Sequence, residues 1–518
     1  MKQDLQILFM VFFAVAIAFA VLRFLCLNRR DTTEWLILCG ALVFAAVISH
    51  NLYVVLIGLI LIKLFYTGND LDKNMTMFLF LLPILPTGGQ VMLPAPNINF
   101  VIANYTLMAI IVFLMPILPK LIREANLMDR KILLYFPVLF IVLREIPFLL
   151  ADTIDLTHTV SNKILEQSNT GKTRDTIQYL VKYILPYYAM VSWINSDKRL
   201  NLALFAICTS GLVMMIIAVP SGILGWDFFR TLFSDAGDAF RFREGRLRLN
   251  VNMEHSITFG YYVTICLGAL LALVSLVKLN VVRFALVVIC ALPAIFFTIS
   301  KGAMVGALIS LGSFFYFKMQ GSSRKISSAF FATLLLLIAM PFLLATSNTE
   351  SRIEREVAIS EADSFEYRKR LAIAELSLIV EKPLFGYPDA FQTPEMEAMR
   401  QGEGIIDPVN TYLTLALTRG VICLVMYFIL IYAGISGVLR YARAGWERRK
   451  TGRVMVGAAL AATYLSISVQ MIFTSFNGMI SVLFWIVSGI CMGVSHGMNL
   501  KKKRAKGPIN FGLIKEAH

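Results

Sequence analysis

Long apolar runs recur along the whole chain, and they limit its fold more than any other feature. Hydrophobic residues make up 58% and aromatic residues 12% of the 518 residues, and the mean hydropathy is +0.71. In lipid, only helices and closed barrels satisfy every backbone polar group. Because about twenty apolar residues cross a hydrocarbon core as a helix, the pattern predicts an all-α, polytopic integral membrane protein with about fourteen transmembrane helices.

The predicted spans divide into long apolar runs and shorter or more polar ones. The long runs lie at 5–27, 76–93, 100–119, 131–150, 201–224, 256–277, 281–299, 302–317, 326–346, 411–439, 454–473 and 477–497, and the others at 33–49, 51–66 and 177–195. No small-residue cleavage site follows the first run, which is typical of a retained helix and not of a signal peptide. We therefore expect one transmembrane domain, 1–518, without a separable soluble domain.

The distribution of basic residues predicts the orientation. The tail, 499–518, begins with Lys501 to Arg504, and segment 440–453 has six basic residues against one acid. Basic loops stay in the cytoplasm, so both segments are predicted to be cytoplasmic. Alternation then places 225–255 and 347–410 outside and leaves the side of the N-terminus open. Most of the formal net charge of +15 is thereby topological, and nucleic-acid binding is not expected.

Four arginines within eight residues lie in the outward-facing basic loop, where the positive-inside rule selects against them. They are Arg241, Arg243, Arg246 and Arg248. Guanidinium groups match the oxygens of phosphate, so the cluster indicates anion binding. The alternative is a solvated helix face paired with nearby acids. The seven cysteines and five histidines are too scattered to predict a disulfide or a metal site.

The longer outward loop is predicted to hold an amphipathic helix that lies on the membrane surface as a lid. Asp363 and Glu366 have the spacing of a capping box, and apolar residues follow as far as Val380. Pro383 and Gly386 would end the helix.

Three stretches carry a resemblance to a known family. Arg368 is followed fifteen residues later by Pro-Leu-Phe-Gly, and Asn-Thr-Tyr-Leu at 410–413 then leads into a span with a glycine turn at Gly420. Thr-Ile-Ser-Lys-Gly-Ala at 298–303 has a lysine where the family has arginine. With 248–260, this pattern resembles the O-antigen ligase and Wzy polymerase superfamily, over roughly 200–440. The resemblance implies a GT-C-like membrane fold with large periplasmic loops.

One departure from the family pattern bears on the activity. Many ligases have His-Asn before Tyr-Leu, whereas this chain has Val409-Asn410, preceded by Asp407. The local sequence looks closer to exopolysaccharide polymerases of the same superfamily. We therefore expect a polymerase, with O-antigen ligase, which transfers glycan to lipid A core, as the alternative. A transporter or flippase, or a scaffold of a secretion machine, remains open as another class.

The resemblance implies an inverting, metal-independent glycosyltransferase of the bacterial inner membrane, with its active site facing the periplasm. The donor would be an oligosaccharide on undecaprenyl diphosphate. Membrane lipids and a separate chain-length regulator would be further partners, and no cofactor is expected. Such a reaction needs cations that stabilise the leaving diphosphate and a base for the acceptor hydroxyl.

Candidate residues can be assigned to these roles. Pyrophosphate binding is assigned to Arg248 and Lys301, followed by Arg246 and Arg368, and the base to Asp407, with Glu254 and His255 in reserve. Asn410 and Tyr412 belong to the acceptor-facing loop.

Each role has a simpler structural alternative. Lys301 could snorkel from the start of its helix. Asp407 could cap the helix that follows it. His255 could make a hydrogen bond at a span boundary, and Arg144 with Glu145 could form a structural ion pair.

Overall fold

The computed structural model describes most of the chain. The described residues are 2–25, 30–49, 52–85, 90–95, 98–103, 105–125, 179–225, 242–243, 246–251, 253, 255–277, 281–319, 352–387, 390–400, 406, 408, 410–447, 451–474 and 478–505.

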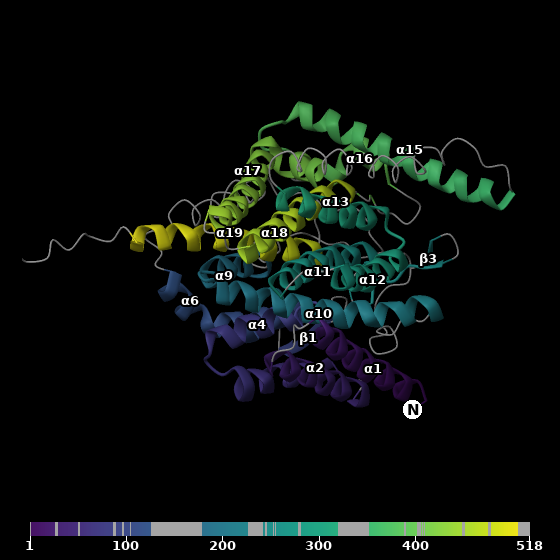
Figure 1. Ribbon diagram of the computed structural model, residues 1–518. Helices are drawn as coiled ribbons and strands as arrows, with labels where there is room; N and C mark the ends of the chain where they lie inside the picture. Colours follow the sequence, from purple (N-terminus) through teal and green to yellow (C-terminus); the bar gives the residue numbers. More distant parts are fainter. Residues whose placement is uncertain are drawn as a thin grey trace, which may run out of the picture.

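The described chain is almost entirely helical (Figure 1). The helical segments are α1 (Lys2–Phe24), α2 (Arg30–Ser49), α3 (Leu52–Leu61), η1 (Ile62–Thr67), α4 (Leu71–Leu81), α5 (Tyr105–Ala109), η2 (Ile110–Leu114), η3 (Met115–Ile117), α6 (Leu118–Ala125), η5 (Leu180–Ile184), α9 (Leu185–Trp193), α10 (Asp197–Leu224), α11 (Ser256–Val277), α12 (Val281–Phe297), α13 (Lys301–Lys318), α15 (Arg352–Glu381), η6 (Ala390–Gln392), α16 (Pro394–Glu397), α17 (Thr411–Glu447), α18 (Thr451–Gln470), η7 (Met471–Phe473) and α19 (Gly478–Ala505). Two antiparallel hairpins complete it: β1 (Gln90–Ala95) with β2 (Ile98–Ala103), and β3 (Phe242–Arg243) with β4 (Arg246–Leu247).

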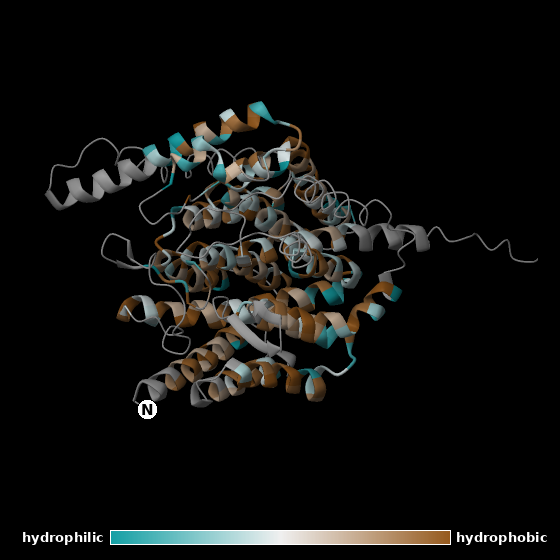
Figure 2. Ribbon diagram, turned by 180° about the vertical axis from the view of Figure 1, so that it is seen from behind, coloured by the Kyte–Doolittle hydropathy of each residue, from teal (hydrophilic) through white to brown (hydrophobic). Residues whose placement is uncertain are grey.

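The predicted fold class, a polytopic helical membrane protein, is confirmed. Within the described residues, six helical stretches are long and apolar enough to cross a membrane, and four shorter apolar helices accompany them. Figure 2 shows hydrophobic residues along most of these helices. The predicted spans 131–150 and 326–346 lie outside the described residues, so the expected number of about fourteen stays a prediction.

Two predicted spans have the wrong bounds. The runs at 76–93 and 100–119 were expected to be continuous helices, but α4 ends at Leu81, the hairpin β1–β2 follows, and helix resumes at Tyr105. The reason is local, because Pro83, Pro86 and the glycine pair at 88–89 interrupt this stretch. Proline removes a helical hydrogen bond and clashes with the preceding turn. Hydropathy averaged over the run concealed these breakers.

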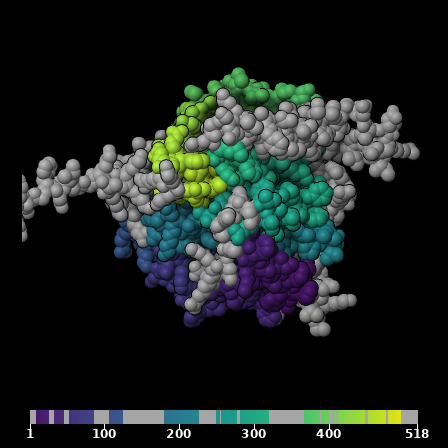
Figure 3. All heavy atoms as spheres, in the orientation of Figure 1, coloured from purple at the N-terminus to yellow at the C-terminus, as the bar shows by residue number. Residues whose placement is uncertain are grey.

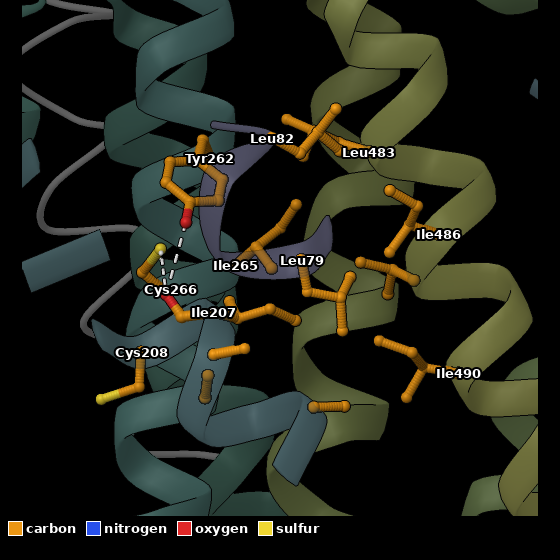
Figure 4. Packing of buried hydrophobic residues seen from close by; sticks show 14 of the residues in the cluster. Leu79, Leu82, Ile207, Cys208, Tyr262, Ile265, Cys266, Leu483, Ile486 and Ile490 are labelled. Atoms are coloured by element: carbon orange, nitrogen blue, oxygen red, sulfur yellow. Dashed lines mark hydrogen bonds between the residues drawn. The ribbon is translucent and has the colours of Figure 1, made fainter. Parts of the chain in front are cut away.

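The core of the bundle lies where α4, α10, α11 and α19 meet. Figure 4 shows Leu79, Ile207, Ile265 and Ile486 packed together there, and each of these side chains is at most 5% exposed. The thiol of Cys266 donates to the carbonyl oxygen of Ile207 at 3.6 Å. The cysteines described at this point behave as small core residues, as the sequence predicts.

Small residues allow the helices to approach closely. A Cβ atom on Gly268 of α11 would lie 1.7 Å from the hydroxyl of Thr463 on α18, and one on Gly211 of α10 would lie 2.2 Å from the sulfur of Cys266. Such contacts are typical of helices packed within a membrane, where small residues bring the backbones together.

Ion pairs fasten one end of the bundle, which we call the ion-pair end. Asp72 accepts from Arg199 at 2.8 Å and from the indole of Trp193 at 2.8 Å. Asp197 accepts from Arg453 at 3.1 Å and from Tyr441 at 3.1 Å. The segments around 197–199 and 440–453 therefore lie at one end, in agreement with the predicted alternation.

The opposite end, which we call the Lys301 end, is where α11, α13 and α17 begin and where α12 and α18 finish. In Figure 1 the hairpin strand β3 lies toward the right, and the last turns of α19 lie toward the left.

The long helix α15 has the predicted end but not the predicted start. It begins at Arg352, eleven residues before Asp363, so Asp363 is inside the helix and does not cap it. Residues 352–362 include no proline or glycine, and nothing in them stops the helix earlier. Figures 1 and 3 show α15 along one edge of the molecule, on the opposite side from α1.

Helix α17 covers the predicted span 411–439 and continues to Glu447, with a break at Gly420, the position of the predicted glycine turn. Gly420 has φ 85° and ψ 165°, and the turn after α15 docks at this break. The amide of Val421 donates to the carbonyl oxygen of Pro383 at 2.7 Å. The amide of Tyr387 donates to the carbonyl oxygen of Leu417, also at 2.7 Å. A Cβ on Gly420 would lie 2.0 Å from the carbonyl oxygen of Leu384, so glycine is required here.

Candidate functional site

The Arg248 segment is joined to the turn that carries Lys301. The amide of Leu249 donates to the carbonyl of Phe297 at 3.0 Å, and the Leu249 side chain is buried. Phe297 is the last residue of α12, and Lys301 is the first residue of α13. The backbone thus brings two predicted cationic ligands, fifty-three positions apart in the sequence, onto neighbouring segments.

Both segments contain a backbone conformation that their residue types rarely adopt. Val251 has φ 57° and Ile299 has φ 49°, and they are the only residues other than glycine with positive φ in the described chain. Left-handed conformations are unfavourable for β-branched residues. Such strain persists where the surrounding structure imposes it, and it is enriched at functional sites. Its occurrence on both sides of the Leu249–Phe297 hydrogen bond supports this location as a site.

Lys301 occupies a helix start, where a positive charge opposes the helix dipole. Its side chain is exposed, and the hydroxyl of the preceding Ser300 caps α13 by accepting from the amide of Ala303 at 3.4 Å. Arg248 is half-buried. A lysine at this position concentrates positive potential beside the amides of the first helical turn, which is the arrangement that binds anions.

The start of α17 lies near the start of α13, and the residues that follow α18 connect the two. The amide and the hydroxyl of Thr411 donate to the carbonyl of Thr474 at 3.0 and 2.5 Å. A Cβ on Gly302 would lie 3.3 Å from that of Phe473. Residues 473–474 therefore bridge the starts of α13 and α17.

The start of α11 packs against the start of α13. A Cβ on Gly260 would lie 2.4 Å from the Cβ of Ala303. The three helices α11, α13 and α17 therefore begin at one end of the bundle, and their dipoles add there.

Asn410 and Tyr412 have structural contacts that sequence reasoning did not foresee. The side-chain oxygen of Asn410 accepts from the amides of Tyr412 and Leu413, at 3.0 and 3.3 Å. The hydroxyl of Tyr412 donates to the carbonyl of Ser468 at 2.5 Å. Asn410 is therefore a cap of α17, a role that the sequence also suggests for Asp407.

The remaining candidates are placed in part. Asp407 and Glu254 lie outside the described residues, as do Arg144 and Glu145. Arg246 is described only as the first residue of β4. His255 is exposed beside the start of α11, and its carbonyl accepts from the amide of Phe259 at 3.1 Å. Arg368 is exposed on α15.

Sequence reasoning missed the buried carboxyl group of Glu375. This side chain is 2% exposed between Leu371 and Leu378 of α15, on the side packed against α17, and its Oε1 atom makes no hydrogen bond. Loss of solvation raises the pKa of Glu375 to about 7. An acid at helical spacing with buried leucines was the signal that could have identified it.

A second missed residue is Gln470, buried in the last turn of α18. Its amide nitrogen donates to the hydroxyl of Thr264 on α11 at 3.0 Å. The side chain packs against Gly306 of α13, where a Cβ would lie 1.8 Å away, and Ser466 donates to the Gly306 carbonyl. This network fixes α11, α13 and α18 relative to one another beneath the starts of α11 and α13.

Comparison with known proteins bears on this region. A family model described as O-antigen ligase matches residues 285–428, which run from α12 to the first half of α17. A search of curated proteins finds no match. The matched stretch includes Lys301, Arg368 and Asp407 but stops short of Arg248, so it is narrower than the resemblance inferred from the sequence. It identifies residues 285–428 as a domain similar to the O-antigen ligase/Wzy-like superfamily, whose members are glycosyltransferase-like membrane enzymes.

Proposed function

We propose that the chain is a polysaccharide polymerase that acts at the periplasmic face of a bacterial inner membrane. It would transfer a glycan from undecaprenyl diphosphate onto an acceptor repeat unit. The observation that carries this proposal is the junction of the Arg248 segment with the Lys301 turn through the Leu249–Phe297 hydrogen bond. Two cations and three helix starts at one end of the bundle suit a diphosphate.

The chemistry needs two kinds of group. As the bond to the anomeric carbon breaks, negative charge develops on the leaving diphosphate, and Arg248 and Lys301 would stabilise it, assisted by Arg246 and Arg368. The acceptor hydroxyl loses its proton to a base, for which Asp407 is the first candidate and Glu254 and His255 are the reserves. Attack opposite the departing diphosphate inverts the configuration at the anomeric carbon.

Polymerase is preferred over ligase because of the residues before the start of α17. The chain has Asp407, Pro408 and Val409 where many ligases carry a histidine. The cap of α17 that the structure describes is Asn410, and a carboxylate three residues before it suits the role of base. A transporter or flippase remains the alternative from another class.

Reconstitution separates these functions. The purified protein in liposomes would receive a lipid-linked repeat unit as its only sugar substrate. A polymerase yields a ladder of longer lipid-linked chains. A product that appears only after lipid A core is added would assign a ligase, and passage of the substrate across the bilayer without new glycosidic bonds would assign a flippase.

Metal independence is part of the proposal. Among the residues that the structure describes, no group of three or more His, Cys, Asp or Glu side chains could hold a metal ion. We expect polymer formation in liposomes to continue in EDTA, because Arg248 and Lys301 would supply the positive charge that stabilises the leaving diphosphate. Loss of polymer that magnesium or manganese restores would contradict this part of the mechanism.

A further inference from the structure

The surface of α15 that faces away from α17 changes character along the helix. Three charged residues lie on this face in the turns before Ile373 and are exposed: Glu366, Lys369 and Arg370. Apolar side chains replace them in the following two turns and in the adjoining bend. These are Ile373, Leu376, Val380, Leu384 and Phe385, and they are between 49% and 77% exposed. Spacings of three, four and seven residues keep the helical positions on one face.

Helix α17 indicates how deep this apolar part lies in the membrane. No Asp, Glu, Lys or Arg occurs between Arg419 and Arg440. The twenty residues from Gly420 to Leu439, at about 1.5 Å each, measure about 30 Å, which is the thickness of a hydrocarbon core. Gly420, where the helix breaks, therefore lies at the boundary between hydrocarbon and headgroups.

Backbone hydrogen bonds hold the end of α15 at this boundary. Val421 donates to Pro383, and Tyr387 donates to Leu417, so Leu384 and Phe385 lie level with Gly420. The lipid-facing side of α17 continues just below them, where Val425, Phe428 and Ile429 are each more than 45% exposed. The apolar face of α15 is thus continuous with the surface of a membrane span.

We propose that the C-terminal turns of α15 and the bend at Pro383–Phe385 insert into the outer lipid interface, with acyl chains as their partner. The charged turns at Glu366 and Lys369 then stand in water. Ile373 to Val380 covers about 10 Å of helix, and amphipathic helices bury an apolar face about 5–10 Å into the interface. The hydroxyl of Tyr387 donates to Glu381 at 2.8 Å, and tyrosine is a residue type enriched at membrane interfaces.

This proposal does not depend on the enzymatic function, and quenching of a fluorescent label tests it. Single substitutions Val380→Cys and Leu384→Cys, with Glu366→Cys and Lys369→Cys as matched controls on the same face, would carry one fluorophore each. The full-length protein would be placed in vesicles of phosphatidylethanolamine and phosphatidylglycerol. The parent protein measures background labelling, since its described cysteines are buried or half-buried.

The expected result is quenching by a lipid nitroxide near the top of the acyl chain that is several-fold stronger at 380 and 384 than at 366 and 369. Iodide in the buffer should give the reverse order. Equal quenching by iodide at all four positions would overturn the proposal. So would protection of 380 and 384 from both quenchers, because protein would then cover the face. An unchanged elution profile from gel filtration confirms that each variant is folded.

Discussion

The two ends of the bundle place charge at helix starts in opposite ways. At the ion-pair end, α10 begins with Asp197 and α4 has Asp72 in its first turn, and both acids pair with arginines. Acids near a helix start are favoured by the dipole, so these charges stabilise the fold. At the Lys301 end, α13 begins with a lysine, which the dipole disfavours.

The comparison separates charges that serve folding from a charge that serves binding. A bundle selected only for stability would place an acid or a neutral residue at the start of α13. The lysine, the strained residues Val251 and Ile299 and the Arg248 segment meet instead at one turn. The next experiments test whether each end has the role that this contrast assigns to it.

The largest effect is expected at the Lys301 end. Lys301→Ala and Arg248→Ala should each reduce polymer yield in liposomes about 100-fold, because each removes a charge-assisted contact to the departing diphosphate. Lys301→Arg should retain activity, since it keeps the charge. Lys318→Ala, at the far end of the same helix, is the matched control and should act like the wild type. Normal yield from both alanine variants at equal protein levels would remove the assignment.

Substitution of Asp407 should have the next largest effect on polymer yield. Asp407→Asn keeps the shape but removes the basic group, so turnover should fall about 100-fold while binding of the lipid-linked donor persists. Asn410→Asp is the control, because aspartate caps a helix as well as asparagine does. If Asp407→Asn retains full activity, the base must be sought at Glu254 or His255.

At the ion-pair end, a substitution should lower stability more than activity. Asp197→Ala leaves the poorly exposed Arg453 without its carboxylate and should lower the free energy of unfolding by about 2 kcal/mol. Thermal unfolding in detergent measures this change. Lys369→Ala breaks a pair whose two side chains are more than half exposed, so its effect should be within about 0.5 kcal/mol. Loss of polymer from folded Asp197→Ala at low temperature would show that this end also serves catalysis.

The last effect, a change of stability with pH, is expected where α15 docks on α17. Burial raises the pKa of Glu375 from 4.5 to about 7, so the docked helix holds a proton that the undocked helix releases. Docking is therefore strongest below pH 4.5 and weakens as the pH rises through 7, by on the order of 1–3 kcal/mol. Glu375→Gln should abolish this dependence.

Hydrogen exchange of residues 371–381 at pH 6 and pH 8, corrected for intrinsic exchange rates, measures the effect, with α18 as an internal reference. The same pH dependence in wild type and Glu375→Gln would show that another group controls docking.

Much of the architecture was readable from the sequence because membrane insertion depends on local properties. Apolar length predicts a span, and basic loops predict its side, so the fold class and the shared end of 197–199 and 440–453 followed directly. One error arose because hydropathy averaged over a run concealed residues that end a helix, as at Pro83 and Pro86. Another arose because a helix began before its apparent cap, as at Asp363. The family resemblance likewise depended on short local patterns around 298–303, 368–386 and 410–420.

What the sequence determined by itself was which residue types are present and that they lie in a membrane. Helix packing brought Leu249 into hydrogen-bond contact with Phe297, let two backbones touch at Gly386 and Gly420, and buried Glu375 and Gln470 between helices. These relations join residues far apart in the chain, and they depend on how helices pack. Packing is a property of pairs of surfaces, so no single stretch of sequence carries it.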